Sequence, residues 1–577
     1  MPRLAFRGAV LLRLVAETAA WATFEALNAL FGIPIQAGAF VVTLELDLGS
    51  RVDSGQGCHR LHGPGFVEFP QPQGGVKQQC QRSYIAWIRS SSLHNCNELR
   101  KHGLEIHSQL PVTRRPFLIL TITYTIVLFG STAIQHFLLG TQGWDLGIFE
   151  QFNWLIANGH INTISSLRDI TPLQDHFSLL LLPIALIYKL LPNAYTLLAL
   201  QSLALGSLTA LSAELCRRRN IAPQLTWALA IAIILNPYSF LVNRGEFHVE
   251  ALTLPLMLLA ITETTQKRRW LYYASLLLSL FAKSAQALFG FGLALYALAR
   301  GQRTRAGITA GVSLAWWLIA SKMASAGGDY INLRLGYLGG SKLEIIITLL
   351  SKPWTVFSEA SPESILLYTV GLSLPFLALF RLRSWPALLG ASPIYLTNLI
   401  SASGIQRELN HHYSVGILAF LIAGCIDSIG TAPISMRLHA KRIVAITALL
   451  ATTALFAYGR IGYYSTRYLP RMQEAMHFQQ AKRVIPNGAS VLAMRNYVSH
   501  MAGRLTIRQI EYDYGPIDQY EWIVLPAPNV PIEVGGKLIA AGHSRVGARL
   551  RDVINEAEVN GMQCNEANSS IVVCSRG

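Results

Sequence analysis

The stretch from Gly143 to Trp154 is the first candidate for chemistry, with two acids, two tryptophans and two phenylalanines in twelve residues. Asp145, at the edge of an apolar helix, could act as a general base or a metal ligand. Alternatively, Asp145 only caps that helix, because Asp often precedes an apolar-periodic run. Glu150 is a second catalytic candidate, but it lies about 140° further round a helix and should not share that face. The alternative for Glu150 is a solvated side chain.

Two further clusters combine acids with cationic side chains. Asp175 and His176 either bind a substrate or cap the apolar element that follows them. The segment Asn243–Glu250 has four ionisable side chains, which either bind a substrate or are ordinary loop polarity; they are Arg244, Glu246, His248 and Glu250. The acids and the histidine of this segment could ligate a divalent cation, but their spacing matches no known metal motif. We therefore assign no metal ligand, and the cofactor stays unknown.

Three cationic or proton-exchanging positions complete the set. Lys283 lies in the otherwise apolar stretch 270–298, where a central lysine costs roughly 2.5–3.5 kcal/mol on insertion and usually faces a polar cavity. It could neutralise a phosphate, or it could extend to the surface. Arg407 offers a bidentate fork for phosphate. The neighbouring His411 and His412, followed by Tyr413, could bind substrate or shuttle protons.

These positions must be held by membrane-embedded helices. The chain has 577 residues, of which 51% are hydrophobic and 14% charged, whereas soluble proteins have about 25% charged residues. Apolar runs recur from 117 to 461, which predicts a polytopic, mainly α-helical membrane protein in contact with membrane lipid. The net charge is +16, but the basic residues cluster between apolar runs, which favours the positive-inside rule over nucleic-acid binding.

The spacing of the apolar runs predicts eleven spans. Arg114 and Arg115 precede the first and indicate a cytoplasmic start. The element 177–191 contains Pro183 and covers about 22 Å as a helix, too short to cross, so we expect it to be re-entrant or interfacial. The spans are 117–138, 194–213, 222–240, 250–265, 270–282, 285–299, 306–323, 365–380, 385–400, 414–429 and 443–461. An odd number places all candidate sites and the C-terminus on the outer face of the plasma membrane.

The remaining segments are not spans. Residues 1–111 show no lasting periodicity, and we expect them to be poorly ordered or translated upstream of the true start. No methionine lies between Met1 and Met257, so such a start would use another codon. The loop 324–364 should contain a surface helix at 342–350. Residues 462–577 predict a small α/β domain with strands at 490–494, 522–525 and 570–574 and helices at 472–484 and 547–558. Cys564 and Cys574 either pair across a hairpin or stay free.

The chain resembles the membrane-protein family known as domain of unknown function 2079 (DUF2079). The motifs that carry the resemblance are Trp144–Gln151, Asp175–Ser178, Glu246–Ala251 and His412–Ser414. This sequence differs from the family pattern at two places. It has Lys283-Ser284-Ala285 where the family has Lys-Glu-Asp, and His248-Val249-Glu250-Ala251 where the family has His-Pro-Glu-Ala. The acids missing beside Lys283 leave no basis there for a second carboxylate or a metal site.

This resemblance implies a GT-C-type glycosyltransferase fold over residues 112–461, followed by the extracytoplasmic domain. Such enzymes transfer sugars from polyprenyl-phosphate donors, and Asp145 takes the place of their catalytic carboxylate in the first outer loop. Two other functions remain open, namely a lipid or solute transporter (flippase) and a non-catalytic membrane scaffold. A lipid-facing cavity that brings Asp145 and Lys283 close together would favour the enzyme.

Overall fold

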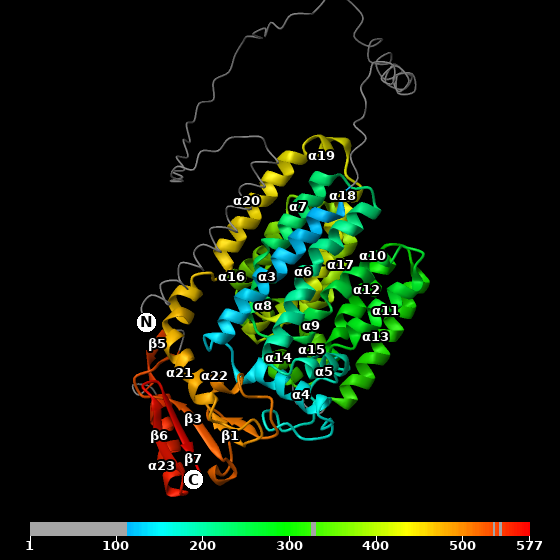
Figure 1. Ribbon diagram of the computed structural model, residues 1–577. Coiled ribbons are helices and arrows are strands. Elements are labelled where there is room, and N and C mark those ends of the chain that lie inside the picture. The colour runs from blue at the N-terminus through cyan, green and yellow to red at the C-terminus, as the bar shows by residue number, and fades with distance from the viewer. Residues whose placement is uncertain (1–111, 325–329, 535–536, 542–544, 577) are drawn as a thin grey trace, which may run out of the picture. The chain divides into compact units, whose positions relative to one another are not determined.

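The computed structural model describes residues 112–324, 330–534, 537–541 and 545–576. The prediction for residues 1–111 lies outside these ranges. The first helix, α3 (Arg114–Phe137), has the side-chain distribution of a membrane helix (Figure 1). Leu118, Ile122 and Ile126 are exposed along one side, whereas Thr121 and Gln135 are buried on the other. Apolar side chains thus face the position of the lipid, and polar ones face neighbouring helices.

Helices dominate the described residues from 114 to 482. After α3 come η1 (Gly143–Gly147), α4 (Ile148–Ala157), α5 (Leu181–Leu190), α6 (Ala194–Arg218), α7 (Pro223–Ile234), α8 (Pro237–Arg244), α9 (Val249–Leu252), α10 (Leu254–Glu263), α11 (Arg269–Leu280), η2 (Ser284–Gln286), α12 (Ala287–Ala299) and α13 (Arg303–Met323). The second half contains α14 (Tyr330–Leu335), η4 (Gly336–Leu338), α15 (Lys342–Ser351), η5 (Pro353–Ser358), α16 (Pro362–Ser373), η6 (Leu374–Phe376), η7 (Leu382–Ser384), α17 (Trp385–Leu399), η8 (Gly404–Arg407), η9 (His412–Ser414), α18 (Val415–Gly430), α19 (Ile434–Leu438), α20 (Ala440–Tyr458), η10 (Tyr464–Tyr468), η11 (Leu469–Arg471) and α21 (Met472–Lys482).

Each predicted span corresponds to helical structure, but not always to one long helix. Within the described residues, five helical segments are long and apolar enough to cross a membrane: 114–137, 194–218, 223–244, 412–430 and 440–458. Several other apolar helices are shorter, as in α10 and α12. Pro237 starts a new helix within the predicted span 222–240, because proline cannot donate a backbone hydrogen bond to the preceding turn. The total of eleven spans stays a prediction.

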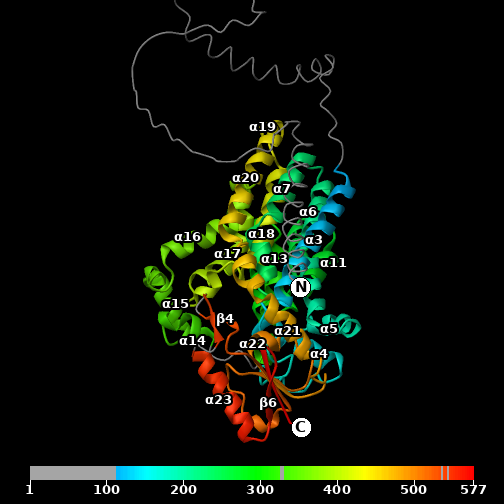
Figure 2. The ribbon, with the colours of Figure 1, turned by 60° about the vertical axis from the view of Figure 1, so that its left-hand side comes forward.

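The short element α5 has the length expected of a helix that does not cross the membrane. It contains ten residues and lies across the direction of α6 (Figure 2). Leu186, Leu190 and Leu191 are 64–79% exposed, whereas Ile184 and Tyr188 are buried against α4 and its surroundings. An apolar exposed side next to a buried one is typical of a helix that rests at a membrane interface.

The loop between α13 and α16 contains the predicted surface helix. It forms as α15, with the Ser341 side chain accepting a hydrogen bond from the backbone N–H of Glu344. Leu343, Ile346 and Leu350 recur along the exposed side of α15. Because these positions share one helical face, this helix also has the pattern of an interfacial element.

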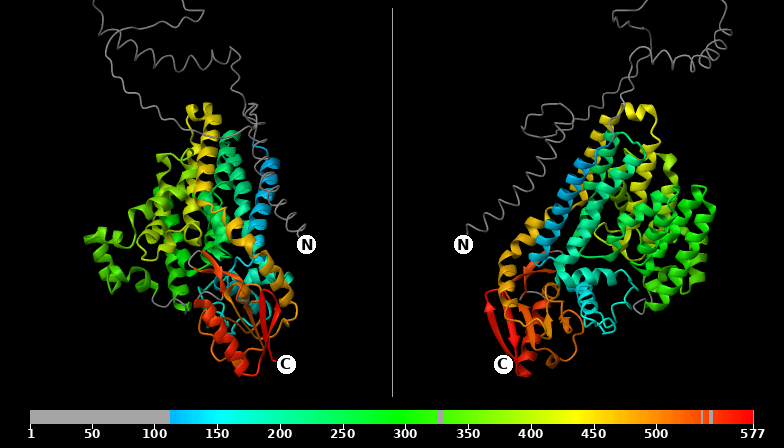
Figure 3. Two further views of the ribbon diagram at one scale, coloured as in Figure 1. Left: turned by 90° about the vertical axis from the view of Figure 1, so that its left-hand side faces the viewer. Right: turned by 45° about the vertical axis from the view of Figure 1, so that its right-hand side comes forward.

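The C-terminal part folds as a small α/β domain, as predicted. Its elements are β1 (Val491–Ala493), α22 (Arg495–Val498), β2 (Ile507–Gln509), η12 (Ile517–Gln519), β3 (Trp522–Pro526), β4 (Pro531–Val534), β5 (Lys537–Ala540), α23 (Arg545–Val559), β6 (Gln563–Asn568) and β7 (Ile571–Ser575). Five strands form a sheet in the order β2-β1-β3-β7-β6, and β4 and β5 form a separate hairpin. The β1–β2 and β1–β3 pairs are parallel, and the β3–β7 and β6–β7 pairs are antiparallel. The sheet lies at the opposite end of the helical bundle from α19 (Figures 1 and 3).

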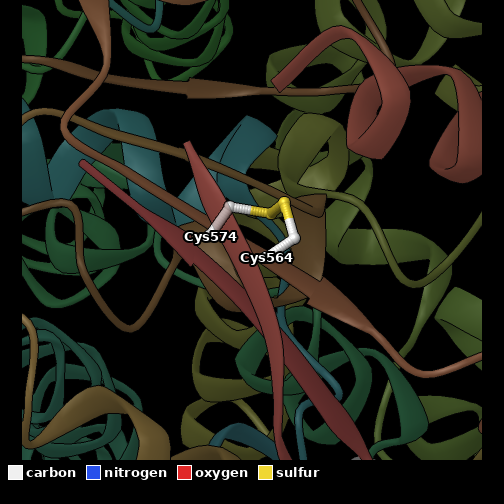
Figure 4. Close-up of a disulfide and its surroundings, with 2 residues drawn as sticks. All are labelled: Cys564 and Cys574. Carbon is white, nitrogen blue, oxygen red and sulfur yellow. A yellow bond between two sulfur atoms is a disulfide. The ribbon is translucent and has the colours of Figure 1, made fainter. Parts of the chain in front are cut away.

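Cys564 and Cys574 form a disulfide between β6 and β7 (Figure 4). The two residues are directly opposite each other in the antiparallel register. The pairing across a hairpin, one of the two alternatives left by the sequence, is therefore the one the structure adopts. It joins the last strand of the chain to its neighbour at the edge of the sheet.

The C-terminal domain packs directly on the segment that contains Asp145. A Cβ added to Gly143 would lie 2.7 Å from Cγ1 of Val498, so only glycine permits this approach. Trp144 stacks on Tyr512 with ring centroids 5.1 Å apart. Arg508 also forms an ion pair with Asp169, beyond α4. These contacts fix η1 between the membrane helices and the soluble domain.

Candidate active site

The backbone around Asp145 is organised by a glutamate one hundred positions later in the chain. One carboxylate oxygen of Glu246 accepts the backbone N–H of Gln142 at 2.8 Å, and the other accepts that of Leu146 at 2.9 Å. Glu246 therefore supplies acceptors for the start of the π-helical turn η1. The N-cap residues of η1 and α4 are Gln142 and Gly147, so the interpretation of Asp145 as a helix cap is wrong.

With its backbone held in this way, Asp145 is directed towards His248, which lies beside a second histidine. Its Oδ1 lies 3.7 Å from Nε2 of His248, and its side chain keeps 41% exposure. The His248 ring in turn lies 4.0 Å, between centroids, from the ring of His412. Burial alone would raise the pKa of Asp145, but His248, with weaker effects of His411 and Lys283, holds it below its ordinary value. Asp145 is therefore ionised at neutral pH.

Glu246 behaves in the opposite way. Burial and the nearby charge of Asp145 raise the pKa of Glu246 well above its usual range, against the lowering effect of the two N–H donors. Two carboxylates this close cannot both ionise easily. The charge of the pair therefore resides on Asp145, the member that is open to solvent.

Lys283 forms the second polar centre. Its Nζ lies 2.8 Å from Oε1 of Glu250, and both side chains are largely buried. The same oxygen of Glu250 lies 3.4 Å from Nε2 of His412. Lys283 is thus held by an ion pair and does not extend to the surface. An acid does stand beside the lysine, but it is supplied by Glu250 from the separate helix α9.

Backbone hydrogen bonds dock the Lys283 loop onto the Asp175 segment. The N–H of Ser284 donates to the carbonyl of His176 at 3.0 Å. The indole of Trp316 donates to the carbonyl of Lys283 at 3.1 Å. Asp175 accepts from Arg168 at 3.0 Å and lies 3.5 Å from the His176 ring. The N-cap of α5 is Leu180, so Asp175 does not cap that helix.

A cavity of about 1000 Å³ unites these groups. It falls at the upper end of the range for small-molecule sites. The predicted site residues that line it are Asp145, Asp175, His176, His248, Glu250, Lys283, His412 and Tyr413. The part of its wall formed by α12, α13 and α17 contains the apolar side chains of Leu288, Trp317 and Ile394, together with the polar Ser321, Thr397 and Asn398. One cavity thus joins a polar centre to an apolar region among the membrane helices.

The other predicted site residues lie elsewhere. Glu150 is 5% exposed and its Oε1 accepts a hydrogen bond from Tyr188, so the expected solvated side chain is wrong. Glu150 lines a different cavity from the one that Asp145 lines. This agrees with the angle of about 140° that separates the two side chains around a helix. The side chain of Glu246 accepts hydrogen bonds from backbone N–H groups at the start of η1. His411 lies 3.7 Å from Glu408 and does not line the Asp145 cavity.

Arg244 and Arg407 are not among the residues that line the Asp145 cavity, because irregular backbone occupies their guanidinium groups. Arg244 donates to the Tyr468 hydroxyl and to the carbonyl of Arg460. Arg407 donates to the carbonyls of Ser401 and Glu359, among others. Both arginines satisfy acceptors that have no partner within a helix. Their geometry therefore supports a structural role in place of the predicted contact with phosphate.

A family model described as predicted membrane protein (DUF2079) matches residues 135–537, well over half of the chain. The chain belongs to this family. Among solved structures, the crystal structure of ArnT from Cupriavidus metallidurans in the apo state is similar, with 12% identity and a TM-score of 0.44 over 78% of this chain and 98% of that chain. At this identity and TM-score, the similarity assigns no reaction or substrate. No curated protein matches the chain. The family and the structure together show a mainly helical membrane protein with a small C-terminal sheet.

The structure adds site residues that the sequence did not single out. Arg168 and Arg334 line the cavity with Lys283. Arg168 lies over the ring of Trp144, and Arg334 over that of Tyr413. Arg168 comes from the loop between α4 and α5, and Arg334 comes from the short helix α14. Neither segment shows apolar periodicity, so no local pattern marks the two arginines. The cavity lining then contains three cations (Arg168, Lys283, Arg334) and three carboxylates (Asp145, Asp175, Glu250).

Gln201 of α6 is another residue without a sequence signal. It is fully buried, and its Nε2 donates to the carbonyl of Glu246 at 2.6 Å. Its Oε1 accepts the backbone N–H of His248 at 2.8 Å. One amide thereby fixes both ends of the segment that presents Glu246 and His248. A polar residue in a membrane helix commonly satisfies such backbone groups.

The acids and histidines do not form a metal site. Among the described residues, no three His, Cys, Asp or Glu side chains gather in a way that could hold a metal ion. The predicted cation ligands also diverge, because Glu246 accepts two backbone N–H groups while Glu250 is paired with Lys283. These residues do not fit a divalent cation.

The role of Glu246 leads to a first prediction. Glu246→Gln should lower the free energy of unfolding by about 1–3 kcal/mol, because the amide NH₂ leaves one backbone N–H of η1 without its acceptor. Thermal unfolding of the purified protein in detergent measures this loss. Glu566→Gln is the matched control, since Glu566 is exposed on β6 and should leave the transition unchanged. Equal transitions for the two variants would contradict the role of Glu246.

Proposed function

We propose that this protein is an integral-membrane glycosyltransferase that uses a sugar linked to a polyprenyl phosphate. The observation that carries the proposal is the single cavity lined by both Asp145 and Lys283, with apolar side chains of the membrane helices in part of its wall. The family resemblance, which implies a carboxylate in the first outer loop as the catalytic group, supports the same reaction. The apolar part of the wall suits the lipid chain of the donor, and the cationic groups suit its phosphate.

In the proposed reaction, an acceptor hydroxyl attacks the anomeric carbon of the sugar. The new bond joins the acceptor oxygen to that carbon, while the bond from the carbon to the phosphate oxygen breaks. Asp145 orients the hydroxyl and takes its proton, and the electron pair of the broken bond leaves with the lipid phosphate. Lys283 and Arg168 stabilise the charge that develops on this phosphate. His248 holds Asp145 in its ionised form.

The ion pairs of the cavity affect how the phosphate binds. Lys283 is paired with Glu250, and Arg168 with Asp175, so an incoming phosphate competes with a carboxylate for each cation. The proximity of His412 to Glu250 gives that carboxylate a second partner. The arrangement therefore allows Lys283 to turn towards the phosphate without leaving Glu250 isolated. A buried charge without a partner would otherwise be costly.

We further propose that the protein lies in the plasma membrane with the cavity and C-terminal domain on the extracytoplasmic side. The Cys564–Cys574 disulfide supports this side, because disulfides persist in oxidising compartments. Arg437 in α19 supports it too, since α19 lies at the far end of the bundle from the sheet (Figure 1). Arginines at that end fit a cytoplasmic location.

The test is incubation of the purified full chain with labelled polyprenyl-phosphate sugars and candidate acceptors. We expect release of the polyprenyl phosphate together with transfer of the label to the acceptor. The same donors reconstituted with the protein in vesicles distinguish a flippase, which would move the intact donor across the bilayer without breaking a bond. Translocation without release would reject the transferase and favour the flippase. If the protein neither transfers the sugar nor moves the donor across the bilayer, the result would favour the non-catalytic scaffold.

A further inference from the structure

A second cavity of about 710 Å³ lies between the membrane helices and the C-terminal domain. Its walls come from the end of α3, from α4, from the start of α6, from α21 and from the loop after α22. Asp145 does not line it, and Glu150 does not line the Asp145 cavity. The helix α4 therefore separates two cavities of ligand size.

Two buried polar atoms at this second cavity lack a hydrogen-bond partner among the described residues. They are Oε2 of Glu150 and Nε2 of His500, and the two residues are 5% and 7% exposed. The other oxygen of Glu150 accepts from Tyr188, and the His500 ring stacks on that of His136 at 3.8 Å. Buried polar groups are nearly always satisfied, so these two atoms on residues of one cavity are available to bond to a ligand.

The charge of the lining indicates the sign of that ligand. The lining contains one acidic side chain, that of Glu150, and three basic ones, those of Lys482, Arg483 and Arg504. Arg504 is fixed in place because its Nε and Nη1 donate to the carbonyls of Met501 and Ala489. Its Nη2 makes no hydrogen bond within the described residues, whereas Nη2 of both Arg244 and Arg407 is occupied. Lys482 donates to the carbonyl of His500. Rigidly placed cations around a cavity of this size favour an oxyanion.

The neutral part of the lining indicates the rest of the ligand. Gln479, Gln480 and Asn487 provide amides, and Trp154 and Tyr195 provide aromatic side chains. Amides can donate to and accept from hydroxyl groups, while an aromatic side chain supplies flat apolar area with limited conformational freedom. This mixture fits a ring that carries hydroxyl groups as well as a charge.

We propose that this second cavity binds an anionic sugar group, a hydroxylated ring with one phosphate or carboxylate. Lys482 and Arg504 contact the oxyanion, and the free atoms of Glu150 and His500 bond to ring hydroxyls. The ligand is either free in solution or the headgroup of a lipid, because the cavity lies where the membrane helices meet the soluble domain. This proposal does not depend on the proposed sugar transfer, because binding of the anionic sugar to the second cavity is measured without a polyprenyl-phosphate donor.

The state of Glu150 is compatible with an anion nearby. Burial raises the pKa of Glu150 to about 7, against the lowering effects of Lys482, the Tyr188 hydroxyl and the N–H of Ala194. A neutral Glu150 is therefore accessible at neutral pH. A protonated carboxyl can donate to a ligand hydroxyl without repelling the oxyanion.

The test is calorimetric titration of the full chain in detergent with glucose 1-phosphate and with glucuronate, using glucose as the neutral comparison. We expect at least one anionic probe to bind more tightly than glucose. Lys482→Gln should weaken this binding by about 10- to 100-fold, the effect of losing one charged hydrogen bond. Lys482→Arg and Glu150→Gln should keep it within a few-fold. The matched control is Lys189→Gln, at an exposed lysine of α5.

A parallel arm uses phosphatidylinositol in mixed micelles, compared with phosphatidylcholine. Lys482-dependent binding of phosphatidylinositol alone would identify a lipid headgroup as the ligand, and binding of the free sugars would identify a soluble one. Thermal unfolding of each variant shows that it is folded. The proposal is overturned if no anionic probe binds in a Lys482-dependent way, or if folded Lys482→Gln binds as tightly as Lys189→Gln.

Discussion

Asp145→Asn is expected to lower the rate of sugar transfer by about 10²- to 10⁴-fold, the usual contribution of a positioned general base. Asparagine keeps the size of the side chain but cannot take a proton or carry the charge that faces His248. The turn η1 should stay intact, because its backbone is held by Glu246 and not by Asp145. The measurement is release of labelled lipid phosphate by folded protein.

The matched control for Asp145→Asn is Asp518→Asn, because Asp518 is exposed in the C-terminal domain. It should transfer sugar at the rate of the unmodified protein. The pKa of Asp145 is held below its ordinary value, so Asp145 should cause no loss of rate between roughly pH 8 and pH 5. Full activity of Asp145→Asn would remove this residue from the reaction, whatever the behaviour of the control.

Lys283→Met is expected to have the second large effect, on stability as well as on transfer. It removes one partner of the buried Lys283–Glu250 ion pair, and such a loss typically costs about 3–5 kcal/mol. The proximity of His412 to the same carboxylate places the expected loss at the lower end of that range. Transfer should also fall, because the leaving phosphate loses a cation. Thermal unfolding and lipid-phosphate release measure the two effects separately.

A double variant separates these two roles of Lys283. Glu250→Gln combined with Lys283→Met removes both charges, so much of the lost stability should return. Transfer should stay low in the double variant if Lys283 contacts the phosphate. Recovery of both stability and transfer would show that Lys283 only neutralises Glu250, which would favour a structural account of this pair.

The positions of the elements were largely predictable from the sequence. Apolar periodicity and length located the membrane helices, the short α5 and the surface helix α15, because these features depend on residues close together in the chain. In the C-terminal part, the same local patterns located β1, β3, β7, α21 and α23, but they did not locate β2, β4, β5 or β6. The sequence also indicated that Asp145 and Glu150 do not act together, since the helical repeat alone separates their side chains.

Only the tertiary structure decided which polar groups meet. Leu146 and Glu246 are 100 residues apart, yet their hydrogen bond makes Glu246, and not Asp145, the residue that stabilises the start of the helix. Arg244 and Arg407 resembled phosphate-binding residues, but carbonyls of irregular backbone occupy them. The physical reason is that buried N–H and C=O groups outside regular helices need partners from distant segments. Which partner reaches them depends on packing, and no local pattern in the sequence records it.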